Sequence, residues 1–248
     1  MVGIMKVDIR REKKDIQLVP FGDLHYGDKS CNWEKAQKMI DWIDNEKNTR
    51  VILMGDLVNS ATKTSVGGAL FDETMHGQDQ LDFVIDALRP IKKKLYGALV
   101  GNHSQRIIES TGYDPIKLLC NELHTNYYGY GQFIKIKGNG VHYDIYATHG
   151  SSFATLPYTK IKSCLNLSMH KDADIFLMGH VHDLQMYAQE VERIQYNQVI
   201  KSKRYFVLTG HYLNYDNSYA EMKNLIPSKQ GSPVIDLCMT EKQVRVKI

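Results

Sequence analysis

Apolar and polar positions follow two different periods along the first half of the chain. Short uninterrupted apolar runs, typical of strands buried on both faces, alternate with segments in which apolar residues recur as on one face of a helix. The predicted strands are residues 16–21, 51–54 and 95–100, and the predicted helices are residues 31–46, 78–94 and 115–123. This half therefore predicts strands and helices in alternation.

The second half is richer in strands. The clearest are residues 133–136, 143–148, 175–178, 204–208 and 234–239. Strand–helix alternation followed by strand-rich sequence predicts an α/β fold, in which two sheets pack face to face with helices outside. The sequence contains no internal repeat, low-complexity tract or long Pro/Gly/Ser linker, so residues 1–248 are expected to form a single domain.

Residues 60–77 depart from both periods. The segment is polar, contains glycine and is only weakly periodic, which predicts a long loop. Long loops in compact domains are often functional lids. A lid beside a site and a plain surface insertion are both compatible with this segment.

Composition narrows the class of protein. A net charge of +3 is too mild to indicate nucleic-acid binding unless the charge clusters on one face. The four cysteines lack CxxC spacing, which is typical of reduced thiols in the cytoplasm. The charged N-terminus lacks the apolar stretch of a signal peptide, and no apolar run reaches the roughly 20 residues of a membrane span. We therefore expect a cytoplasmic protein with no membrane partner.

Five predicted strands end next to glycine-flanked polar residues. These residues are, in chain order, Asp23 and His25, Asp56, Asn102 and His103, His149, and His180 and His182. Sites in α/β proteins form outside the carboxyl ends of strands, so we expect these side chains to converge. A mixed His/Asp/Asn set suits divalent Mn, Fe, Zn or Ni. Two such ions about 3.5–4 Å apart can clamp a phosphate group.

The spacing within two motifs supports the same interpretation. In Asp23-x-His25 and His180-x-His182, alternate residues of an extended chain point the same way. Alone, a Gly-Asp or a His-x-His pair is more often a turn or a surface pair. Five short motifs in sequence, each after an apolar strand, would rarely arise by chance, so the sequence predicts a metal centre.

These motifs resemble those of the calcineurin-like metallophosphoesterases. That family shows D-x-H, G-D, G-N-H-[DE], a lone His and G-H-x-H, and the match here runs over residues 23–182. The closest resemblance is to small phosphoesterases of phages and bacteria, through TKTSVG at 62–67 and His-Gly at 149–150. The resemblance implies a four-layer fold, in which two mixed sheets form a sandwich flanked by helices.

The resemblance also implies a role for each residue. Asp23, His25 and His182 would bind the first metal ion, Asn102, His149 and His180 the second, and Asp56 would bridge both. A hydroxide shared by the ions would attack phosphorus, and His103 would steady the phosphate charge or protonate the leaving oxygen. The expected cofactors are two divalent ions, with Mn the first choice and Fe, Zn or Ni as alternatives.

One position departs from the family pattern. Ser104 stands where the family has Asp or Glu after the histidine of G-N-H. A serine brings no charge to stabilise an imidazolium. We therefore expect another acid, or the substrate, to compensate beside His103.

Basic residues near the motifs are candidates for contact with the substrate phosphate. Arg106 follows the G-N-H turn and Lys63 lies in the predicted loop; with Asn102 they form the predicted substrate-binding set. Solvated surface charge is the alternative for both basic residues, and Lys160 is a weaker candidate. His211 follows another strand, and a structural role beside the metal set is favoured for it.

Three functions fit these motifs. The leading prediction is a metal-dependent phosphodiesterase acting on nucleic acid or nucleotides, such as a phage-type nuclease. A phosphomonoesterase, including a protein phosphatase, would use the same centre. A non-catalytic metal-binding scaffold would be expected to lack ligands, and none is missing here. The expected partner is the phosphoester substrate, and homo-oligomer formation stays open.

Overall fold

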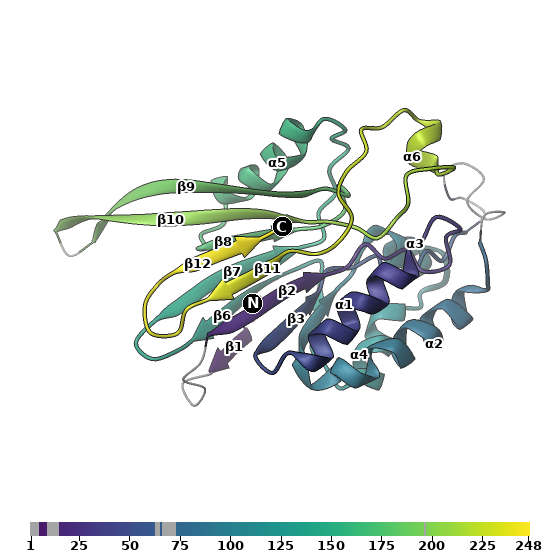
Figure 1. Ribbon diagram of the computed structural model, residues 1–248, viewed down its shortest axis with the longest axis horizontal. Helices are drawn as coiled ribbons and strands as arrows, with labels where there is room; N and C mark the ends of the chain where they lie inside the picture. The colour runs from purple at the N-terminus through teal and green to yellow at the C-terminus, as the bar shows by residue number, and fades with distance from the viewer. Residues whose placement is uncertain (1–4, 9–14, 63–64, 66–72, 196) are drawn as a thin grey trace.

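Two six-stranded mixed sheets form the centre of the protein (Figure 1). The computed structural model describes residues 5–8, 15–62, 65, 73–195 and 197–248. The first sheet has the order β12-β11-β2-β3-β4-β5, with β2 (Ile16–Phe21), β3 (Thr49–Leu53), β4 (Leu95–Leu99), β5 (Tyr127–Gly129), β11 (Val234–Leu237) and β12 (Val244–Lys247). The second has the order β1-β6-β7-β8-β10-β9, with β1 (Met5–Asp8), β6 (Gly131–Lys137), β7 (His142–Thr148), β8 (Ile175–Met178), β9 (Leu184–Gln195) and β10 (Gln198–Thr209).

The apolar runs are explained by burial on both faces of the strands. Along β2, Ile16 and Leu18 belong to the buried cluster between the sheets, together with Ile145 of β7. Val19 and Phe21 belong to the cluster beneath the helices, because successive strand side chains point to opposite faces. A strand covered on both sides has no solvent-facing polar positions, so its sequence reads as a continuous apolar run.

Helices cover the outer face of each sheet. Helices α1 (Trp33–Asn45), α2 (Gly77–Leu88) and α4 (Pro115–Leu123) pack on the first sheet, and α5 (Pro157–Asn166) packs on the second. The remaining helical segments are α3 (Asn102–Thr111), α6 (Tyr219–Met222) and the 3-10 helices η2 (Arg89–Lys94) and η3 (Leu167–Met169). The layers are therefore helix, sheet, sheet and helix, which confirms the predicted α/β sandwich of two mixed sheets flanked by helices (Figure 1).

Three segments differ from the sequence prediction. The predicted helix 78–94 ends as an α-helix at Leu88 and continues as η2, because Pro90 lacks the N–H that an α-helix needs. Helix α3 begins at Asn102, within the G-N-H motif, where no helix was predicted. The predicted strand 204–208 is the end of β10, which pairs antiparallel with β9 to form a long hairpin.

Strand direction brings the predicted site residues to one end of the sandwich. Strands β2, β3 and β4 run parallel in the first sheet, and β7 and β8 run parallel in the second. Their carboxyl ends carry all five motifs. Among the helices that the structure describes, none combines the length and the apolar character needed to span a bilayer.

Candidate metal centre

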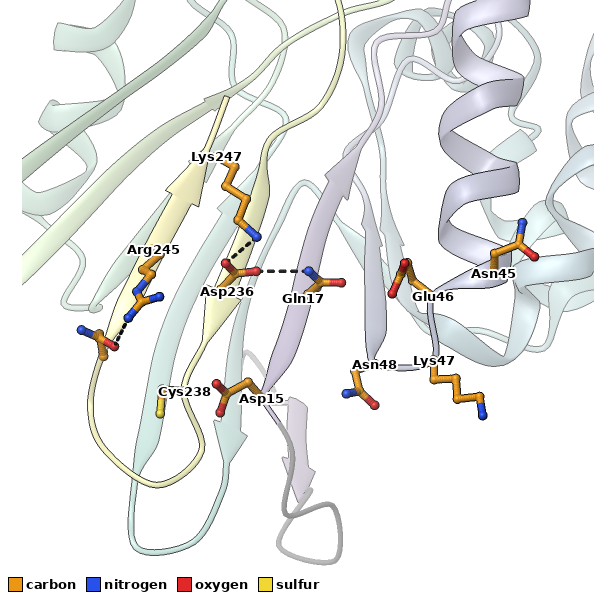
Figure 2. A pocket seen from close by; sticks show the side chains of 11 residues that line it. Asp15, Gln17, Asn45, Glu46, Lys47, Asn48, Asp236, Cys238, Arg245 and Lys247 are labelled. Carbon is orange, nitrogen blue, oxygen red and sulfur yellow. Dashed lines mark hydrogen bonds and ion pairs between the residues drawn. The ribbon is translucent and has the colours of Figure 1, made fainter.

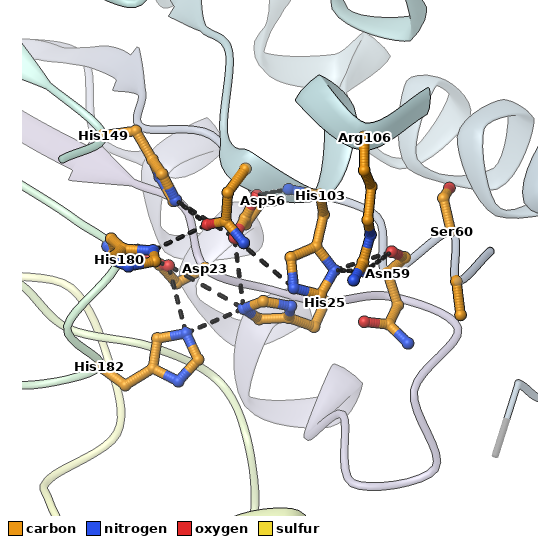
Figure 3. A network of polar contacts seen from close by, with 12 residues as sticks. Asp23, His25, Asp56, Asn59, Ser60, His103, Arg106, His149, His180 and His182 are labelled. Atoms are coloured by element: carbon orange, nitrogen blue, oxygen red, sulfur yellow. Dashed lines mark hydrogen bonds and ion pairs between the residues drawn. The ribbon is translucent and has the colours of Figure 1, made fainter. Parts of the chain in front are cut away.

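The five motifs meet at the carboxyl ends of β2, β3, β4, β7 and β8. Figure 3 shows their side chains pointing toward one another from both sheets. The seven predicted metal ligands and His103 all lie in this cluster. Three groups of donor residues have ligand atoms within 4.8 Å of one another: Asp23, His25 and His182; His25, Asp56 and His103; and Asp56, His149 and His180.

The first predicted metal position is defined by Asp23, His25 and His182. The Nε2 atoms of His25 and His182 are 2.9 Å apart, and His182 Nε2 is 3.4 Å from Asp23 Oδ1. Asp23 and His25 are buried. Burial, followed by the charges of neighbouring histidines, holds the pKa of His25 well below its usual value, so this imidazole is neutral and able to donate a lone pair.

The second predicted metal position is defined by Asn102, His149 and His180. Asn102 Oδ1 is 2.9 Å from His149 Nε2 and 2.7 Å from His180 Nδ1. Burial is the main cause that lowers the pKa of His180. This group, like the first, brings an oxygen donor and two imidazoles to one point.

Asp56 lies between the two groups. Its Oδ2 atom is 3.2 Å from His149 Nε2 and 3.9 Å from His25 Nε2. Its Oδ1 atom accepts a hydrogen bond from the backbone N–H of His103, 2.9 Å away, at the start of α3. A free N–H at a helix N-terminus is a favourable partner for a carboxylate. This geometry fits the bridging role predicted for Asp56.

The backbone at the site is strained. Asp23, His25, Asp56, His180 and His182 all have φ between 47° and 69°, a left-handed conformation that non-glycine residues rarely adopt. Each such residue costs about 1–3 kcal/mol, and strain of this kind clusters at functional sites. Five of the ten non-glycine residues with positive φ in the described part of the chain are predicted metal ligands.

Glycines next to the ligands permit this close approach. A Cβ atom on Gly101 would overlap the Asp56 carboxylate, and one on Gly55 would lie 2.8 Å from His149 Nδ1. Gly55 also has φ of +93°. Space therefore requires glycine at both positions, and at Gly55 the left-handed backbone conformation requires it as well.

The buried histidine of the second group is oriented from behind. His149 Nδ1 lies 2.8 Å from the carbonyl oxygen of Met54, which can only accept, so Nδ1 carries the proton and Nε2 faces the site. Ligand histidines typically donate their other N–H to a carbonyl in this way. Burial opposes protonation of His149, but the Asp56 carboxylate outweighs it and raises the pKa of His149 to about 9. The surroundings of His149 Nε2 therefore stabilise a positive charge, either a proton or a bound cation.

The donor set fits two divalent metal ions. The Nε2 atoms of His25 and His182 face each other. At this distance at most one of the two nitrogens can carry a proton toward the other. A cation between the donor atoms would remove this conflict and offset the buried charge of Asp56. Asp23, His25 and His182 would hold one ion, Asn102, His149 and His180 the other, and Asp56 would contact both.

The catalytic candidate His103 is oriented by a backbone carbonyl. Its Nδ1 atom lies 2.8 Å from Asn59 O, and its Nε2 atom faces Asp56 Oδ2 at 3.9 Å. Ser104 is fully buried, and its hydroxyl has no hydrogen-bond partner among the described residues. Among the described residues, the group within hydrogen-bond distance that orients the ring from the Nδ1 side is the carbonyl of Asn59 and not a carboxylate.

Arg106 lies behind His103 rather than among the ligands (Figure 3). Its Nη2 atom donates to Asn59 O at 2.9 Å and lies against the His103 ring. Burial is the main cause that lowers the pKa of His103, and the Arg106 charge adds to it. A phosphate contact by Arg106 stays a prediction, and the predicted contact by Lys63 lies outside the described residues.

The described ends of the predicted loop are tied to the site by Glu73. This carboxylate accepts hydrogen bonds from Asn59 Nδ2 at 2.6 Å and from Ala61 N at 2.9 Å, and it also pairs with the buried Gln80. Asn59 in turn orients His103. Sequence reasoning missed Asn59 and Glu73, because neither stands in a recognisable motif.

His211 lies beside His182, a predicted metal ligand, but outside the three donor groups. Its ring stacks on His182, with centroids 5.4 Å apart, and its Nδ1 accepts from Leu213 N at 3.1 Å. Its Nε2 lies 2.8 Å from Ser228 Oγ, which donates to the carbonyl oxygen of His182. Burial lowers the pKa of His211 to about 3, so the ring is neutral. Ser228 was not identified from the sequence, and its hydrogen bond connects its own loop to the backbone of His182.

Comparison with known proteins identifies relatives of the fold only. No protein-family model and no curated protein matches the chain. Similar solved structures include a metallophosphoesterase from Sphaerobacter thermophilus (11% identity, 94% of this chain and 87% of that chain, TM-score 0.47). Vps29 from Chaetomium thermophilum (16%, 94% and 96%, 0.46) and a predicted phosphoesterase from Streptococcus pneumoniae (12%, 90% and 83%, 0.38) are also similar. At these values the likenesses carry no information on activity, which has to be argued from the site.

The fold and the site have the features that the motif resemblance implies. The four layers, the order of the motifs and their convergence at one end of the sandwich are those expected of a calcineurin-like metallophosphoesterase. The donor set is suited to divalent metal ions.

Proposed function

We propose that the protein is a phosphodiesterase that depends on two divalent metal ions, with Mn the expected physiological choice. The observation that carries the proposal is the buried carboxylate of Asp56 between two donor groups, with Oδ2 3.2 Å from His149 Nε2 and 3.9 Å from His25 Nε2. Strained backbone at the ligands supports it further, because a fold keeps such conformations where function requires them.

The predicted metal ligands and His103 have different roles in the proposed reaction. When bound here, a pair of divalent ions would withdraw charge from a phosphoryl oxygen and lower the pKa of an attacking water. His103 presents Nε2 to the same space, with its orientation fixed by Asn59 O. In the neutral form this nitrogen can accept a hydrogen bond, and in the protonated form it can give a proton to the leaving oxygen.

A substrate panel with added Mn²⁺ tests the proposal. It compares bis-p-nitrophenyl phosphate, p-nitrophenyl phosphate, single- and double-stranded DNA, RNA and cyclic nucleotides. We expect metal-dependent hydrolysis of diesters. Hydrolysis of the monoester alone would replace the diesterase by a phosphomonoesterase. Tight Mn²⁺ binding in calorimetry without hydrolysis of any substrate would show a metal-binding scaffold.

A further inference from the structure

A cavity of about 420 Å³ opens directly beside the predicted metal ligands. His103, His180 and His182 are among the residues that line it. Its walls come from two loops: residues 152–155, which follow the His149 motif, and residues 213–230, which include α6. A group attached to a phosphate at the metal centre would therefore extend into this cavity.

Large apolar side chains of the cavity wall face solvent. Phe153 is 97% exposed, Tyr219 50% and Ile226 46%, and all three line the cavity. Grouped apolar exposure around a hollow marks a binding surface. Aromatic rings on both loops offer flat faces on which a planar ring can stack.

The cavity carries little charge. Apart from histidines, Asp28 and Lys160 are the charged residues among those that line it. Lys160 is buried, and its Nζ atom lies 3.6 Å from Asp183 Oδ2. A polynucleotide brings a row of phosphates that needs several lysines or arginines along its path. The walls fit one uncharged, ring-bearing group better than a polymer.

Hydrogen bonds fix the wall formed by residues 213–230. Ser228 connects His211 to the carbonyl oxygen of His182. Gln230 donates to Leu213 O at 2.8 Å and accepts from Asn32 at the same distance. A wall that is already ordered loses little entropy when a ligand binds.

We propose that this cavity binds the nucleoside of a small phosphodiester whose phosphate lies at the metal centre. The inference rests on the proposed phosphodiesterase function and narrows its substrate to nucleoside phosphodiesters. Phe153 and Tyr219 stack on the base, while the phosphate lies beside His103, His180 and His182, the lining residues that belong to the predicted metal centre.

Two chromogenic diesters with the same leaving group test the inference. Thymidine 5′-(p-nitrophenyl phosphate) and methyl p-nitrophenyl phosphate differ only in the group that the cavity would hold. With Mn²⁺ present, we expect kcat/KM to be at least about tenfold higher for the thymidine ester, the scale of one base–aromatic stack. Calorimetry on the Mn²⁺-loaded protein should likewise show thymidine 5′-monophosphate binding at least about tenfold tighter than methyl phosphate.

Substitutions in the cavity wall locate the effect. Phe153→Ala and Tyr219→Ala should each lower the ratio of kcat/KM for the thymidine ester to kcat/KM for the methyl ester, and likewise the ratio of the two affinities measured by calorimetry. Tyr158→Ala is the matched control, because Tyr158 is 67% exposed on α5 but does not line the cavity. Exposed positions of this kind tolerate truncation without unfolding.

The outcomes separate the inference from the function on which it rests. Equal kcat/KM and equal affinity for the paired compounds, with both esters hydrolysed, would overturn the nucleoside site and leave the phosphodiesterase intact. Failure to hydrolyse either ester, or any diester of the panel, would overturn the proposed function itself. An oligodeoxynucleotide hydrolysed at least about tenfold faster than the thymidine ester would replace the small substrate by a polymer.

Discussion

Both ends of the sandwich carry a cavity, yet only one end has the features of a reactive site. At the amino ends of the strands, a cavity of about 530 Å³ is lined by Asp15, Gln17, Asn45, Glu46, Lys47, Asn48, Asp236, Cys238, Gln243, Arg245 and Lys247 (Figure 2). It is larger than the cavity beside the metal centre. Size alone would therefore select the wrong end of the protein.

The difference lies in how the polar groups are satisfied. At the amino end Asp236 pairs with Lys247 at 2.8 Å and accepts from Gln17 at 3.3 Å. No residue lining that cavity has a positive φ. At the carboxyl end, by contrast, like donors such as His25 and His182 face each other on strained backbone. The carboxyl-end site therefore differs in two ways from the amino-end cavity. Nitrogen atoms of the same kind face each other in it, and its backbone is strained.

The largest expected effect is the loss of the shared carboxylate. Asp56→Asn keeps the size of the side chain but removes the charge between the two donor groups, so we expect kcat/KM for bis-p-nitrophenyl phosphate to fall by more than about a hundredfold. Asp236→Asn, the same change at the amino end, should leave activity unchanged. Circular dichroism checks that both variants fold, and equal losses in the two would contradict the comparison.

The next effect concerns the catalytic candidate. His103→Gln should lower kcat by about a hundredfold or more, the usual contribution of a general acid, while Mn²⁺ affinity in calorimetry changes little. His142 lies at the opposite end of β7 from His149 and is exposed, so His142→Gln is the matched control. A large loss of Mn²⁺ affinity in His103→Gln would instead assign His103 to the metal ligands.

A smaller effect is expected at the glycine packed against Asp56. In Gly101→Ala the new Cβ overlaps the carboxylate, which should displace Asp56 and cost about 1–3 kcal/mol in the free energy of unfolding. Gly77→Ala is the control, because its Cβ would lie 3.4 Å from the nearest atom, Ser60 Oγ. Urea denaturation measures both, and equal stability of the two variants would show that the site has room for the methyl group.

Sequence patterns predicted the architecture and the convergence of the five motifs at one end of the sandwich. Buried strands such as β3 leave an uninterrupted apolar run, and a short polar motif at each strand end marks a site. Strand β9 and the outer part of β10 were missed because most of their described side chains are exposed, which leaves no continuous apolar run. Helix α3 was missed because Ser104 is its only buried residue, which leaves no apolar stripe to recognise.

The surroundings of the site were less predictable than the ligands. The carbonyl of Asn59 orients His103, and the hydroxyl of Ser228 supports His182. Backbone carbonyls carry no sequence signature, and contacts across 46 residues depend on how a loop closes. The cavity beside the predicted ligands could not be predicted for the same reason, because its walls belong mostly to loops whose sequences have no periodic pattern.

The smallest effect is expected at Ser104, the position where the family pattern would place an acid. Its hydroxyl is buried without a partner among the residues described, so Ser104→Ala should leave kcat unchanged and raise the free energy of unfolding by up to about 1 kcal/mol. The reason is that Asn59 O, rather than residue 104, orients His103. A fall of about tenfold in kcat, approaching the effect of a catalytic group, would show that Ser104 tunes His103 after all. The pH–rate profile of Ser104→Asp completes the test: because Asn59 O orients His103, the limb assigned to His103 should stay in place.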